Sequence, residues 1–458
     1  MERTARSVSP AGASARFAWD RAASARGRNT AMNVSSCPAI LVSGCASGQG
    51  KTTVTAALAR YHSRAGRRVR VFKTGPDFID PMVLEMASAA PVYNLDCWMV
   101  GTEASRALLA AAATEADMIL VEGAMGLYDG EPSTADLAAT FGLPVVVVID
   151  ANAMAETFGA VAKGLKEYRR VPFAGVIANR VAGAQHAHML AQSLPPDIEL
   201  IAALSETANS LPERHLGLVQ AVEISGLPVF LDELADLLGE SGYTRLPPPV
   251  AFTSTTGCTP DRLLERYRVA VARDSAFSFL YRANLDCLAA MGAELVFFSP
   301  LADEPVPPAD ALYLPGGYPE LHASRLAGNT SWLTSMRAFA DTNRPVLAEC
   351  GGIMVLFDTL TTRDGTEHQM AGLLPGKVMM GQHLAAIGLQ SLALPEGELR
   401  GHTFHYSRLE TPLDPVCRSI PYRYGAGEDV YRQGAITASY LHAYFPSNPG
   451  AVAALLRG

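Results

Sequence analysis

The chain has 458 residues, 49% of them hydrophobic, which is too long for one ordinary core, so we expect two domains of roughly 200 residues each. Its formal net charge of −8 gives no support to binding of nucleic acid or of an anionic membrane, and apolar runs such as residues 143–149 are too short to cross a bilayer. The seven cysteines form no Cys-x-x-Cys pair, so neither a disulfide framework nor a zinc site is indicated, and a reducing cytoplasm fits best.

The first 36 residues differ from the rest of the chain. They are rich in Ala, Ser and Arg, and their only acidic residues are Glu2 and Asp20. A transit peptide has this composition. The favoured alternatives are a disordered tail or a start codon read too early, because Met32 lies just before the first expected strand. We therefore predict that residues 1–36 form a disordered extension.

Residues 37–243 alternate short β-branched runs with longer helical stretches. Expected strands lie at 37–44, 67–75, 116–123, 143–151 and 171–180, and residues 52–66 read as a helix that Gly66 ends. Strands separated by helices indicate a parallel sheet with helices on both faces. This pattern predicts an α/β nucleotide-binding domain.

The segment GCASGQGKTT (44–53) is almost a phosphate-binding loop, but Cys45 occupies the position where the usual pattern has its first glycine. Glycines between a strand and a helix allow backbone amides to face phosphates at a helix N-terminus. Lys51 would then reach the β- and γ-phosphates, and the Thr52 hydroxyl would bind Mg²⁺. The expected ATP-binding residues of this segment are Gly44, Ser47, Gly48, Gly50, Lys51, Thr52 and Thr53.

Acidic residues follow the expected strands of this domain. Asp77 and Asp80 come just after one strand, and Glu122 ends another. Ligands of open α/β sheets bind at the carboxyl ends of strands, and Mg²⁺ takes one or two carboxylates beside a hydroxyl and phosphates. We predict a metal site of Thr52, Asp77 and Glu122. Helix capping or a solvated turn is the alternative for these acids, and for Asp80 the two interpretations are nearly balanced.

A Pro-rich stretch at 244–262 interrupts the alternation, so we place a linker at 244–264 and a second domain at 265–458. Strands are expected in YRVAVARDSAF (267–277), AELVFFSP (293–300), DALYLPGG (310–317), RPVLAECGG (344–352) and AITASYLHAYF (435–445), with a helix at 278–292. The pattern predicts a second α/β domain.

The second domain carries the pattern of an acyl-transfer site. Cys350 stands between an apolar strand and a glycine pair, where we expect a sharp turn to expose the thiol and a helix N-terminus to lower its pKa. Gly316 and Gly317 offer backbone amides for an oxyanion, and His442 is the expected general base. Together they predict a site that hydrolyses the amide of glutamine.

Two features near this site leave alternatives open. Many glutamine amidotransferases have Glu two residues after the histidine, where this chain has Tyr444, so either another group orients His442 or the site is a Cys-His dyad. His402 and His405 are three apart on an expected strand and therefore face opposite sides. We expect them to be structural or to contact substrate rather than to bind a metal.

Eight segments, read together, resemble the cobyrinate or hydrogenobyrinate a,c-diamide synthases of cobalamin biosynthesis: SGQGKTT, FKTGPDFIDP, NLDCWM, VEGAMGLYDG, LPGGYPE, AECGG, GHTFHYS and ASYLHAYF. The resemblance runs from about residue 37 to the C-terminus. The first domain of that family is similar to dethiobiotin synthetase, which has the same longer glycine loop. The second is a glutamine amidotransferase domain of the class I type, with a flavodoxin-like fold.

The resemblance implies a reaction. ATP phosphorylates a peripheral carboxylate of the corrinoid substrate to an acyl phosphate, ammonia released from L-glutamine at Cys350 displaces the phosphate, and the cycle acts on the c carboxylate before the a carboxylate. The cofactors implied are ATP and Mg²⁺. Oligomeric state stays open, with a homodimer as one option.

The resemblance also assigns residues. The family's functional acids correspond to Asp77, Asp80, Glu122 and Asp129, while Tyr128 and the segment NLDCWM line the substrate cleft, although Trp98 could equally be a core residue. Asn179 resembles the adenine contact of the dethiobiotin synthetase group, and Phe78 replaces a tyrosine of some members, so a hydroxyl there is not essential.

Three alternatives to this function remain. Cobyric acid synthase-like amidation of other side chains fits less well, because the segment expected to read DRGG reads IDANAM. Amidation of another metalloporphinoid is possible within the same class. A non-catalytic nucleotide-sensing switch is disfavoured because Lys51, Thr52, Cys350 and His442 are intact. Separately, Ala46 stands where partitioning-type ATPases carry an extra lysine, which argues against a dimerising switch ATPase.

Overall fold

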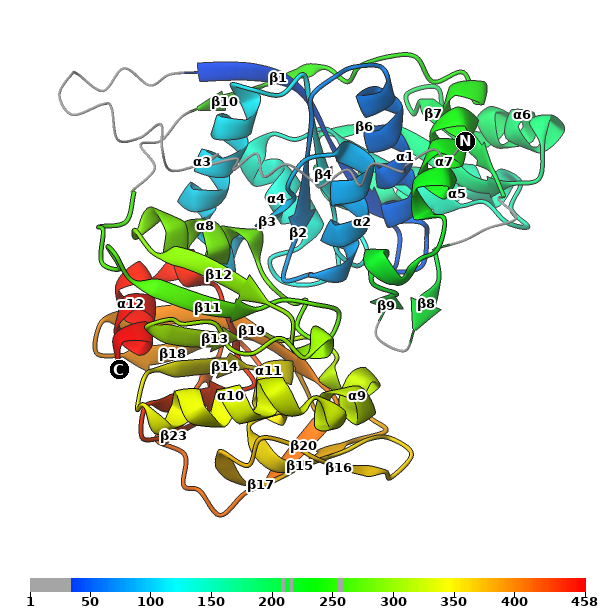
Figure 1. The fold of residues 1–458 in the computed structure, drawn as a ribbon. Coiled ribbons are helices and arrows are strands. Elements are labelled where there is room, and N and C mark those ends of the chain that lie inside the picture. Colours follow the sequence, from blue (N-terminus) through cyan, green and yellow to red (C-terminus); the bar gives the residue numbers. More distant parts are fainter. Residues whose placement is uncertain (1–33, 207–210, 215–216, 254–258) are drawn as a thin grey trace, which may run out of the picture.

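The computed structural model describes residues 34–206, 211–214, 217–253 and 259–458. Two sheets, each with helices on both faces, form the upper and lower parts of the molecule in Figure 1. The expected extension lies outside the described residues up to residue 33, and residues 34–36 already belong to the first strand. Within the described ranges, no helix has the length and apolar character needed to cross a membrane.

Seven strands of the first sheet run parallel, as the alternation of strands and helices predicted. From edge to edge they are β3 (Tyr93–Leu95), β2 (Val69–Thr74), β4 (Met118–Glu122), β1 (Val34–Gly44), β5 (Val145–Asp150), β6 (Phe173–Val181) and β7 (Leu200–Ser205). A parallel sheet brings the carboxyl ends of its strands to one edge, where the phosphate loop, the acidic residues that follow β2 and the acidic residue that ends β4 meet.

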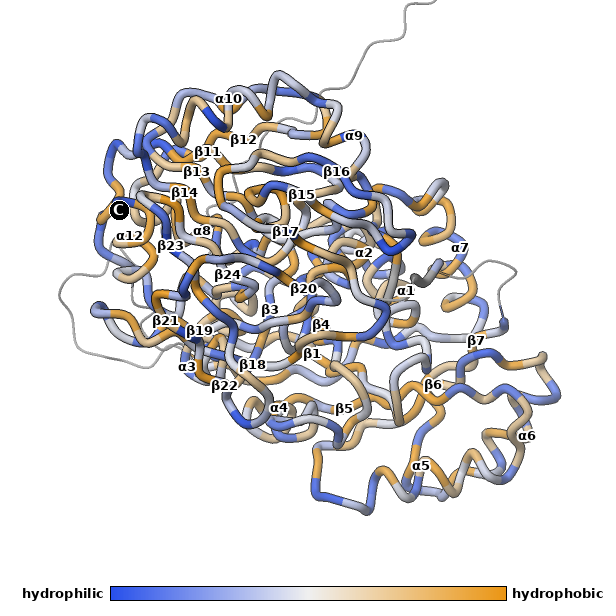
Figure 2. The backbone as a smooth tube through the Cα atoms, turned by 90° about the horizontal axis from the view of Figure 1, so that it is seen from below, coloured by the Kyte–Doolittle hydropathy of each residue, from blue (hydrophilic) through white to orange (hydrophobic). Residues whose placement is uncertain are grey.

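Helices cover both faces of this sheet: α1 (Lys51–Arg64), α2 (Ile79–Ser88) and α7 (Leu227–Glu240) on one, α3 (Thr102–Ala113), α4 (Thr134–Phe141), α5 (Glu156–Tyr168) and α6 (Ala184–Ser193) on the other. Alternation along β1 explains the two layers, because Ala39 and Leu41 pack with α3 to α6 whereas Ile40 and Val42 pack with α1, α2 and α7. Apolar and polar stretches alternate along α5 and α6 in Figure 2, as expected of helices with one buried face.

The segment predicted to be a linker contributes a strand. β10 (Pro249–Thr253) pairs antiparallel with the N-terminal half of β1, so that Val34 is opposite Thr253 and Pro38 is opposite Pro249. Proline is tolerated there because β10 is an edge strand with a free side. Short elements between the main ones are β8 (Glu213–Arg214), β9 (Gly217–Leu218), the 3₁₀ turn η3 (Ala221–Glu223) and the π-helical turn η2 (Cys97–Gly101).

The second sheet is mixed. Five of its strands run parallel, in the order β12 (Glu294–Phe298), β11 (Arg268–Ala272), β13 (Ala311–Leu314), β14 (Val346–Glu349) and β24 (Ile436–Ser439). Beyond β24, β23 (Asp429–Gln433) pairs antiparallel with β24, and β21 (Cys417–Arg418) pairs antiparallel with β23. The order of its first four strands is that of a doubly wound, flavodoxin-like sheet.

Helices and small sheets complete the second domain. The helices are α8 (Arg282–Ala290), α9 (Ala323–Gly328), α10 (Thr330–Asp341), α11 (Gly351–Met354) and α12 (Pro449–Arg457), with 3₁₀ turns η4 (Pro300–Ala302), η5 (Pro319–His322) and η6 (Phe445–Ser447). One small sheet contains β15 (Phe357–Thr361), β16 (Glu367–Gln369), β17 (Leu374–Met380) and β20 (Ser407–Glu410), and another β18 (Ala386–Leu394), β19 (Gly397–His405), β22 (Ile420–Pro421) and β25 (His442–Ala443).

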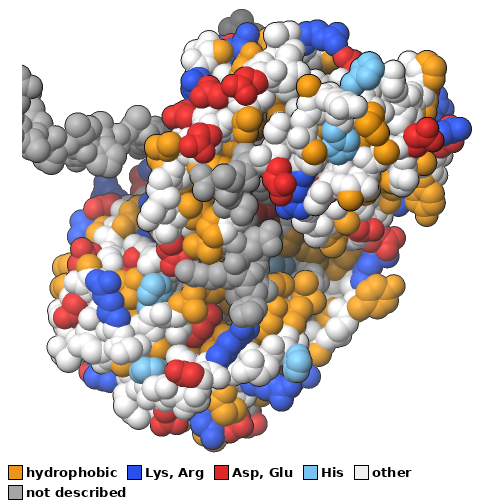
Figure 3. All heavy atoms as spheres, turned by 90° about the vertical axis from the view of Figure 1, so that its right-hand side faces the viewer, with side chains coloured by type: hydrophobic (Ala, Val, Ile, Leu, Met, Phe, Trp, Pro, Cys, Tyr) orange, Lys and Arg blue, Asp and Glu red, His pale blue; other side chains and the backbone are white. Residues whose placement is uncertain are grey.

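The core of the first domain continues into the second. One cluster of buried side chains joins Phe78, Leu95 and Met99 of the first domain to Phe279 and Tyr281 of the second. Figure 3 shows a hollow between the two parts, in which hydrophobic side chains are visible. The two domains therefore share packed apolar surface next to an open space.

Candidate functional site

The glycine loop bends from β1 into α1 at the expected place. Gly48 and Gly50 have φ angles of 76° and 86°, in the left-handed region that favours glycine. A Cβ atom at Gly50 would overlap the side-chain amide of Asn179, whose Nδ2 donates to the Gln49 carbonyl at 3.0 Å. The Asn179 side chain thus holds the glycine loop through a hydrogen bond to its backbone, and its role as an adenine contact stays a prediction.

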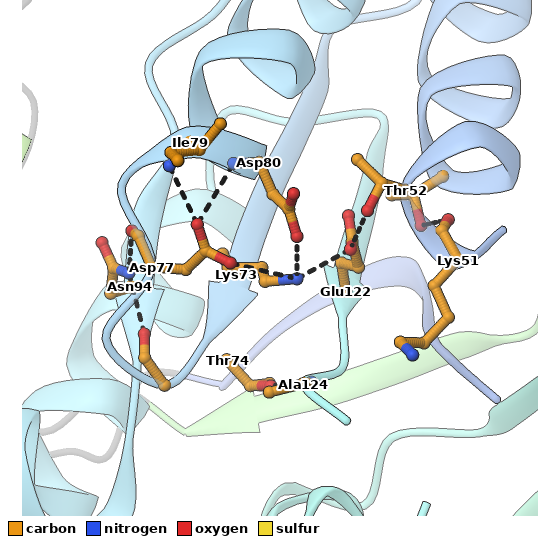
Figure 4. Close-up of polar contacts among 12 residues, drawn as sticks. Lys51, Thr52, Lys73, Thr74, Asp77, Ile79, Asp80, Asn94, Glu122 and Ala124 are labelled. Carbon is orange, nitrogen blue, oxygen red and sulfur yellow. Dashed lines mark hydrogen bonds and ion pairs between the residues drawn. The ribbon is translucent and has the colours of Figure 1, made fainter. Parts of the chain in front are cut away.

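Lys51, the first residue of α1, is turned back onto its own loop. Its Nζ donates to the Ala46 carbonyl at 2.8 Å, and Figure 4 shows it directed away from the carboxylates. Burial and then the charge of Lys73 lower the pKa of Lys51. Phosphates held by the loop would offer this ammonium group a stronger partner than a carbonyl oxygen.

The acidic residues meet around a lysine that the sequence reasoning missed (Figure 4). Lys73, on β2, is buried, and its Nζ lies 2.5 Å from Oδ2 of Asp80, 2.7 Å from Oε1 of Glu122 and 3.7 Å from Oδ2 of Asp77. Burial alone would lower the pKa of Lys73, but these three carboxylates together raise it. A lysine at the end of a buried strand, followed closely by two acids, was the available sequence signal.

The carboxylates differ in their other contacts. Oδ1 of Asp77 accepts from the backbone amides of Ile79 (2.9 Å) and Asp80 (3.1 Å) at the start of α2, and the expected role of Asp77 as a metal ligand stays a prediction. Burial raises the pKa of Asp77 to about 6 and that of Glu122 to about 7. The Lys73 ammonium lowers the pKa of Asp80 despite its burial.

The residues around Glu122 fit a magnesium ion. The Thr52 hydroxyl donates to Oε1 of Glu122 at 2.7 Å, and Oε2 of Glu122 is buried with no hydrogen-bond partner among the described residues. No three acidic, histidine or cysteine side chains in the described part of the chain gather closely enough to hold a metal alone. Magnesium needs only one or two carboxylates when a hydroxyl, phosphates and water complete its shell, so the chemistry of the donors suits it.

Tyr128 and Asp129 lie in the loop after β4 but face different ways. The Tyr128 hydroxyl donates to the Leu165 carbonyl on α5, and the Arg169 guanidinium lies 5.0 Å from its ring. Oδ2 of Asp129 accepts from the Gly126 amide at 3.1 Å. These contacts hold the loop, and the expected substrate contacts of both residues stay predictions.

Cys350 directly follows β14 and forms the sharp turn into α11. Its φ of 45° is unusual for a residue other than glycine, and such strain occurs at nucleophiles on a strand-to-helix turn. A Cβ at Gly351 would lie 2.9 Å from the Gly317 nitrogen, and one at Gly352 would overlap the Leu314 carbonyl. The two glycines therefore allow the loop with Gly316 and Gly317 to pack directly on the turn.

Aromatic rings, rather than a carboxylate, orient His442. Its ring stacks on His402 of β19 (centroids 4.8 Å apart, planes 12° apart) and lies 5.0 Å from the ring of Phe78. His402 is fixed in turn by a hydrogen bond between its Nδ1 and the Tyr281 hydroxyl at 2.9 Å. Nδ1 of His442 has no hydrogen-bond partner among the described residues. These ring contacts hold the imidazole of His442 in a chain that has Tyr444 where many glutamine amidotransferases have a glutamate.

Other polar groups support the neighbourhood of His442 without touching its imidazole. Glu349 accepts from the Ala443 amide (3.1 Å) and from the Tyr313 hydroxyl (2.8 Å), and burial raises its pKa to about 8. His405 takes the opposite side of β19, as expected, where it stacks on Tyr440 and contacts Glu428 at 3.1 Å. These contacts favour the structural one of the two roles expected for His405.

The protonation state of the thiol corrects an expectation. Cys350 is 3% exposed, and burial raises its pKa, with the charge of Glu320 as the next cause. The predicted lowering by a helix N-terminus is wrong because α11 has a single turn and desolvation dominates. Burial also lowers the pKa of His442. Thiol and imidazole are both neutral in this state.

Phe78 joins the two sites. It lies between Asp77 and Asp80 in the chain, stacks on Phe279 (centroids 5.1 Å apart, planes 3° apart) and contacts His442. The loop that carries the acids of the first domain thus packs against the base of the second.

Comparison with known proteins identifies the family to which the chain belongs. Residues 40–218 match the family described as CobQ/CobB/MinD/ParA nucleotide binding domain, and residues 268–450 match the CobB/CobQ-like glutamine amidotransferase domain. The hydrogenobyrinate a,c-diamide synthase of Stutzerimonas stutzeri (strain A1501) is 56% identical over 429 residues, covering 93% of this chain and 100% of that protein. The chain belongs to the cobyrinate and hydrogenobyrinate a,c-diamide synthase family.

Two further relatives agree. The hydrogenobyrinate a,c-diamide synthase of Pseudomonas aeruginosa is 54% identical over 93% of this chain and 98% of its own length. The cobyrinate a,c-diamide synthase of Herminiimonas arsenicoxydans is 54% identical over 90% of this chain and 95% of its own length. As an a,c-diamide synthase family member, the chain is a glutamine-dependent amidating ligase, which confirms the expected family, two-domain fold and class of enzyme.

Proposed function

We propose that this a,c-diamide synthase family member amidates the a and c carboxylates of cobyrinate or hydrogenobyrinate, in cobalamin biosynthesis, with ATP and L-glutamine as co-substrates. One observation carries the proposal: Phe78, which lies in the chain between two of the acids near the phosphate loop, packs against His442 of the second domain, which also carries the strained turn at Cys350. The relatives' names support the choice of substrate.

The first domain would make a carboxylate reactive. A carboxylate is a poor electrophile, so it needs a leaving group, which a phosphoryl group transferred from ATP provides as an acyl phosphate. The loop amides and Lys51, released from the Ala46 carbonyl, would hold the phosphates. Thr52 and Glu122 would hold Mg²⁺, which when bound neutralises phosphate charge. Lys73 keeps Asp80 ionised beside this site.

The second domain would release ammonia. The Cys350 thiol passes its proton to His442 and its sulfur attacks the side-chain amide carbon of glutamine, while the Gly316 and Gly317 amides stabilise the oxyanion. The proton then leaves with ammonia, and water hydrolyses the thioester to glutamate. The neutral pair in this structure predicts slow hydrolysis until ligands bind, since both groups must change charge together.

A separation of activities tests the proposal. Purified protein with Mg²⁺, ATP and glutamine should convert cobyrinate or hydrogenobyrinate to the diamide, followed by mass, and offering both side by side shows whether cobalt is required. Cys350→Ala should abolish glutamine-driven amidation but keep amidation driven by ammonium chloride, because activation occurs in the other domain.

Lys51→Ala is the matched variant, and both nitrogen sources should fail with it because no carboxylate is activated. Loss of ammonium-driven amidation in Cys350→Ala, with the protein still folded, would contradict the two-site proposal.

A further inference from the structure

A continuous strip of side chains crosses between the two domains beside the phosphate loop. Each member contacts the next, and we call it the bridging strip: Met125, Gly130 and Glu131 from the loop after β4, Arg423 and Tyr422 from the loop after β22, and Trp98 from η2. The first domain supplies both ends of the strip, and the second domain supplies its middle. A ligand held on it would therefore touch both domains.

One end of the strip lies at the site where a carboxylate would be activated. Met125 has a φ of 51°, and such strain in a residue other than glycine is concentrated at functional sites. Before it, the Ala124 amide donates to Oγ1 of Thr74 at the end of β2 (2.7 Å). After it, the Leu127 amide donates to the Gly44 carbonyl of the phosphate loop (2.8 Å). Met125 is thus fixed between the end of β2 and the phosphate loop, yet its side chain is 49% exposed.

The middle of the strip is an ion pair that the fold does not need. Arg423 pairs with Glu131 across the two domains, and both side chains are exposed. An exposed ion pair contributes little to stability, because water already solvates both charges. The domains are in any case joined by the buried contact of Phe78 with Phe279. Glu131 is therefore a partner that Arg423 can exchange at small cost.

The strip combines apolar surface with an arginine. Tyr422, partly exposed, lies against Trp98 with ring centroids 4.7 Å apart, and the Arg423 guanidinium lies 5.4 Å from the Tyr422 ring. A second arginine nearby is fixed: Arg400 donates to Glu398 and to the Trp98 carbonyl, both at 2.9 Å. Arginine binds carboxylates through two parallel hydrogen bonds. An apolar ring with several peripheral carboxylates, as in a corrinoid, is complementary to this surface.

We infer that Arg423 leaves Glu131 when the corrinoid binds and pairs instead with a carboxylate of the corrinoid that is not being amidated, while Met125 and Tyr422 contact the apolar ring. The exchange replaces one carboxylate with another, so the charge around the guanidinium is conserved. Arg423 is then a specificity-determining residue for the acceptor, supplied by the domain that releases ammonia. The inference rests on the proposed function and adds this residue to it.

Substitution of the two partners tests the exchange, because it predicts different effects for each. The measured quantity is the KM for the corrinoid in amidation driven by ammonium chloride. Arg423→Gln should raise this KM about 10-fold with little change in kcat, the value of one charge-assisted hydrogen bond, and Arg423→Lys should restore part of the loss. Glu131→Gln should keep the KM or lower it by up to about 5-fold, because it removes a competing carboxylate.

A change in the ligand tests the same contact from the other side. A corrinoid with every carboxylate converted to an amide is assayed as a competitive inhibitor of amidation. Wild-type protein and Arg423→Gln should bind it equally, because it has no carboxylate for Arg423. Weaker binding of this inhibitor by Arg423→Gln would overturn the inference. So would a similar rise in the KM for the corrinoid in both Arg423→Gln and Glu131→Gln, since a fixed latch between the domains needs both partners.

Two controls separate the possible failures. Arg268→Gln removes an exposed arginine that pairs with Glu294 (3.1 Å) at the amino end of β11, and it should leave the KM for the corrinoid unchanged. Glutamate release from glutamine should persist in every variant, which shows that the second domain is folded. An unchanged KM in Arg423→Gln overturns this inference and leaves the proposed function standing. Failure of wild-type protein to amidate the corrinoid with ammonium chloride contradicts the proposed function instead.

Discussion

At the scale of single residues, one ammonium group holds the first site together. Lys73 lies within 2.7 Å of oxygens on Asp80 and Glu122; Lys73 and Glu122 are buried and Asp80 is half-buried. Two acids so close together would repel each other in a medium of low dielectric constant, and the lysine offsets that repulsion. Lys73 is therefore as much part of the site as the acids that the sequence indicated.

Lys73→Met should destabilise the protein by about 3–5 kcal/mol, because it leaves buried carboxylates without their cation. Amidation should be lost with glutamine and with ammonium chloride alike. Denaturant unfolding measures the first effect and diamide formation the second. Lys163→Met, at an exposed lysine 3.9 Å from Glu167, is the control and should change neither. Wild-type stability in Lys73→Met would contradict the ion pairs described above.

The sequence predicted the positions of the candidate site residues better than it predicted their protonation states. Cys350 directly follows β14, Glu122 ends β4, and Asp77 and Asp80 follow β2, as the motifs predicted, while His442 begins β25, shortly after β24. The predicted lowering of the Cys350 pKa was wrong because a local rule about helix ends cannot account for burial by residues distant in sequence. Lys73 was overlooked because the two acids that follow it in the sequence do not by themselves show that the lysine side chain pairs with them in the fold.

At the scale of elements, close backbone packing builds the glutaminase site. The turn after β14 and the loop after β13 contact each other through glycines, and Gly316 faces the His442 ring. A side chain at such a position displaces the group it meets. The spacing between Cys350, His442 and the amides of Gly316 and Gly317 therefore depends on the absence of a methyl group at these glycines.

Gly316→Ala tests this packing, since its Cβ would overlap Cε1 of His442 and push the imidazole aside. We expect glutamine-driven amidation to fall by at least about 100-fold, as when an oxyanion donor is lost. Ammonium-driven amidation should persist, and both are measured by diamide formation. Gly328→Ala, at the end of α9 with open space around it, should behave like wild type. An active Gly316→Ala would mean that His442 adopts another position.

The alternation of strands and helices was enough to predict both main sheets, because each strand is a local apolar run. It was not enough for β10 or for the small sheets containing β15 to β20. β10 directly follows two prolines, begins with a third and pairs only with β1, and the small sheets depend on pairing between distant segments. Non-local pairing leaves little trace in a single sequence.

At the scale of the whole molecule, the two domains act through a common core. Phe78 belongs to the acidic loop of one domain and packs on Phe279 and His442 of the other. On the rim of this contact, the Arg400 guanidinium of the second domain donates to the Trp98 carbonyl of the first at 2.9 Å. Movement of the acidic loop on ligand binding would therefore reach the imidazole directly.

Phe78→Ala should uncouple the two reactions. Removing the ring frees His442, so glutamine-driven amidation should fall on the order of 10- to 100-fold more than ammonium-driven amidation. Phe78→Tyr should restore the balance because it keeps the ring. The ratio of the two rates, measured on the same preparation, is the readout. An equal fall in both rates would show that Phe78 serves only the acidic loop.

The pairing of β10 with β1 has a practical consequence for anyone who separates the two halves. The strand that opens the first sheet has its N-terminal half covered by residues 249–253, which come after the segment expected to end that domain. A fragment cut at residue 243 would expose this edge, and bare strand edges recruit other chains. A soluble nucleotide-binding half should therefore retain the chain through Thr253.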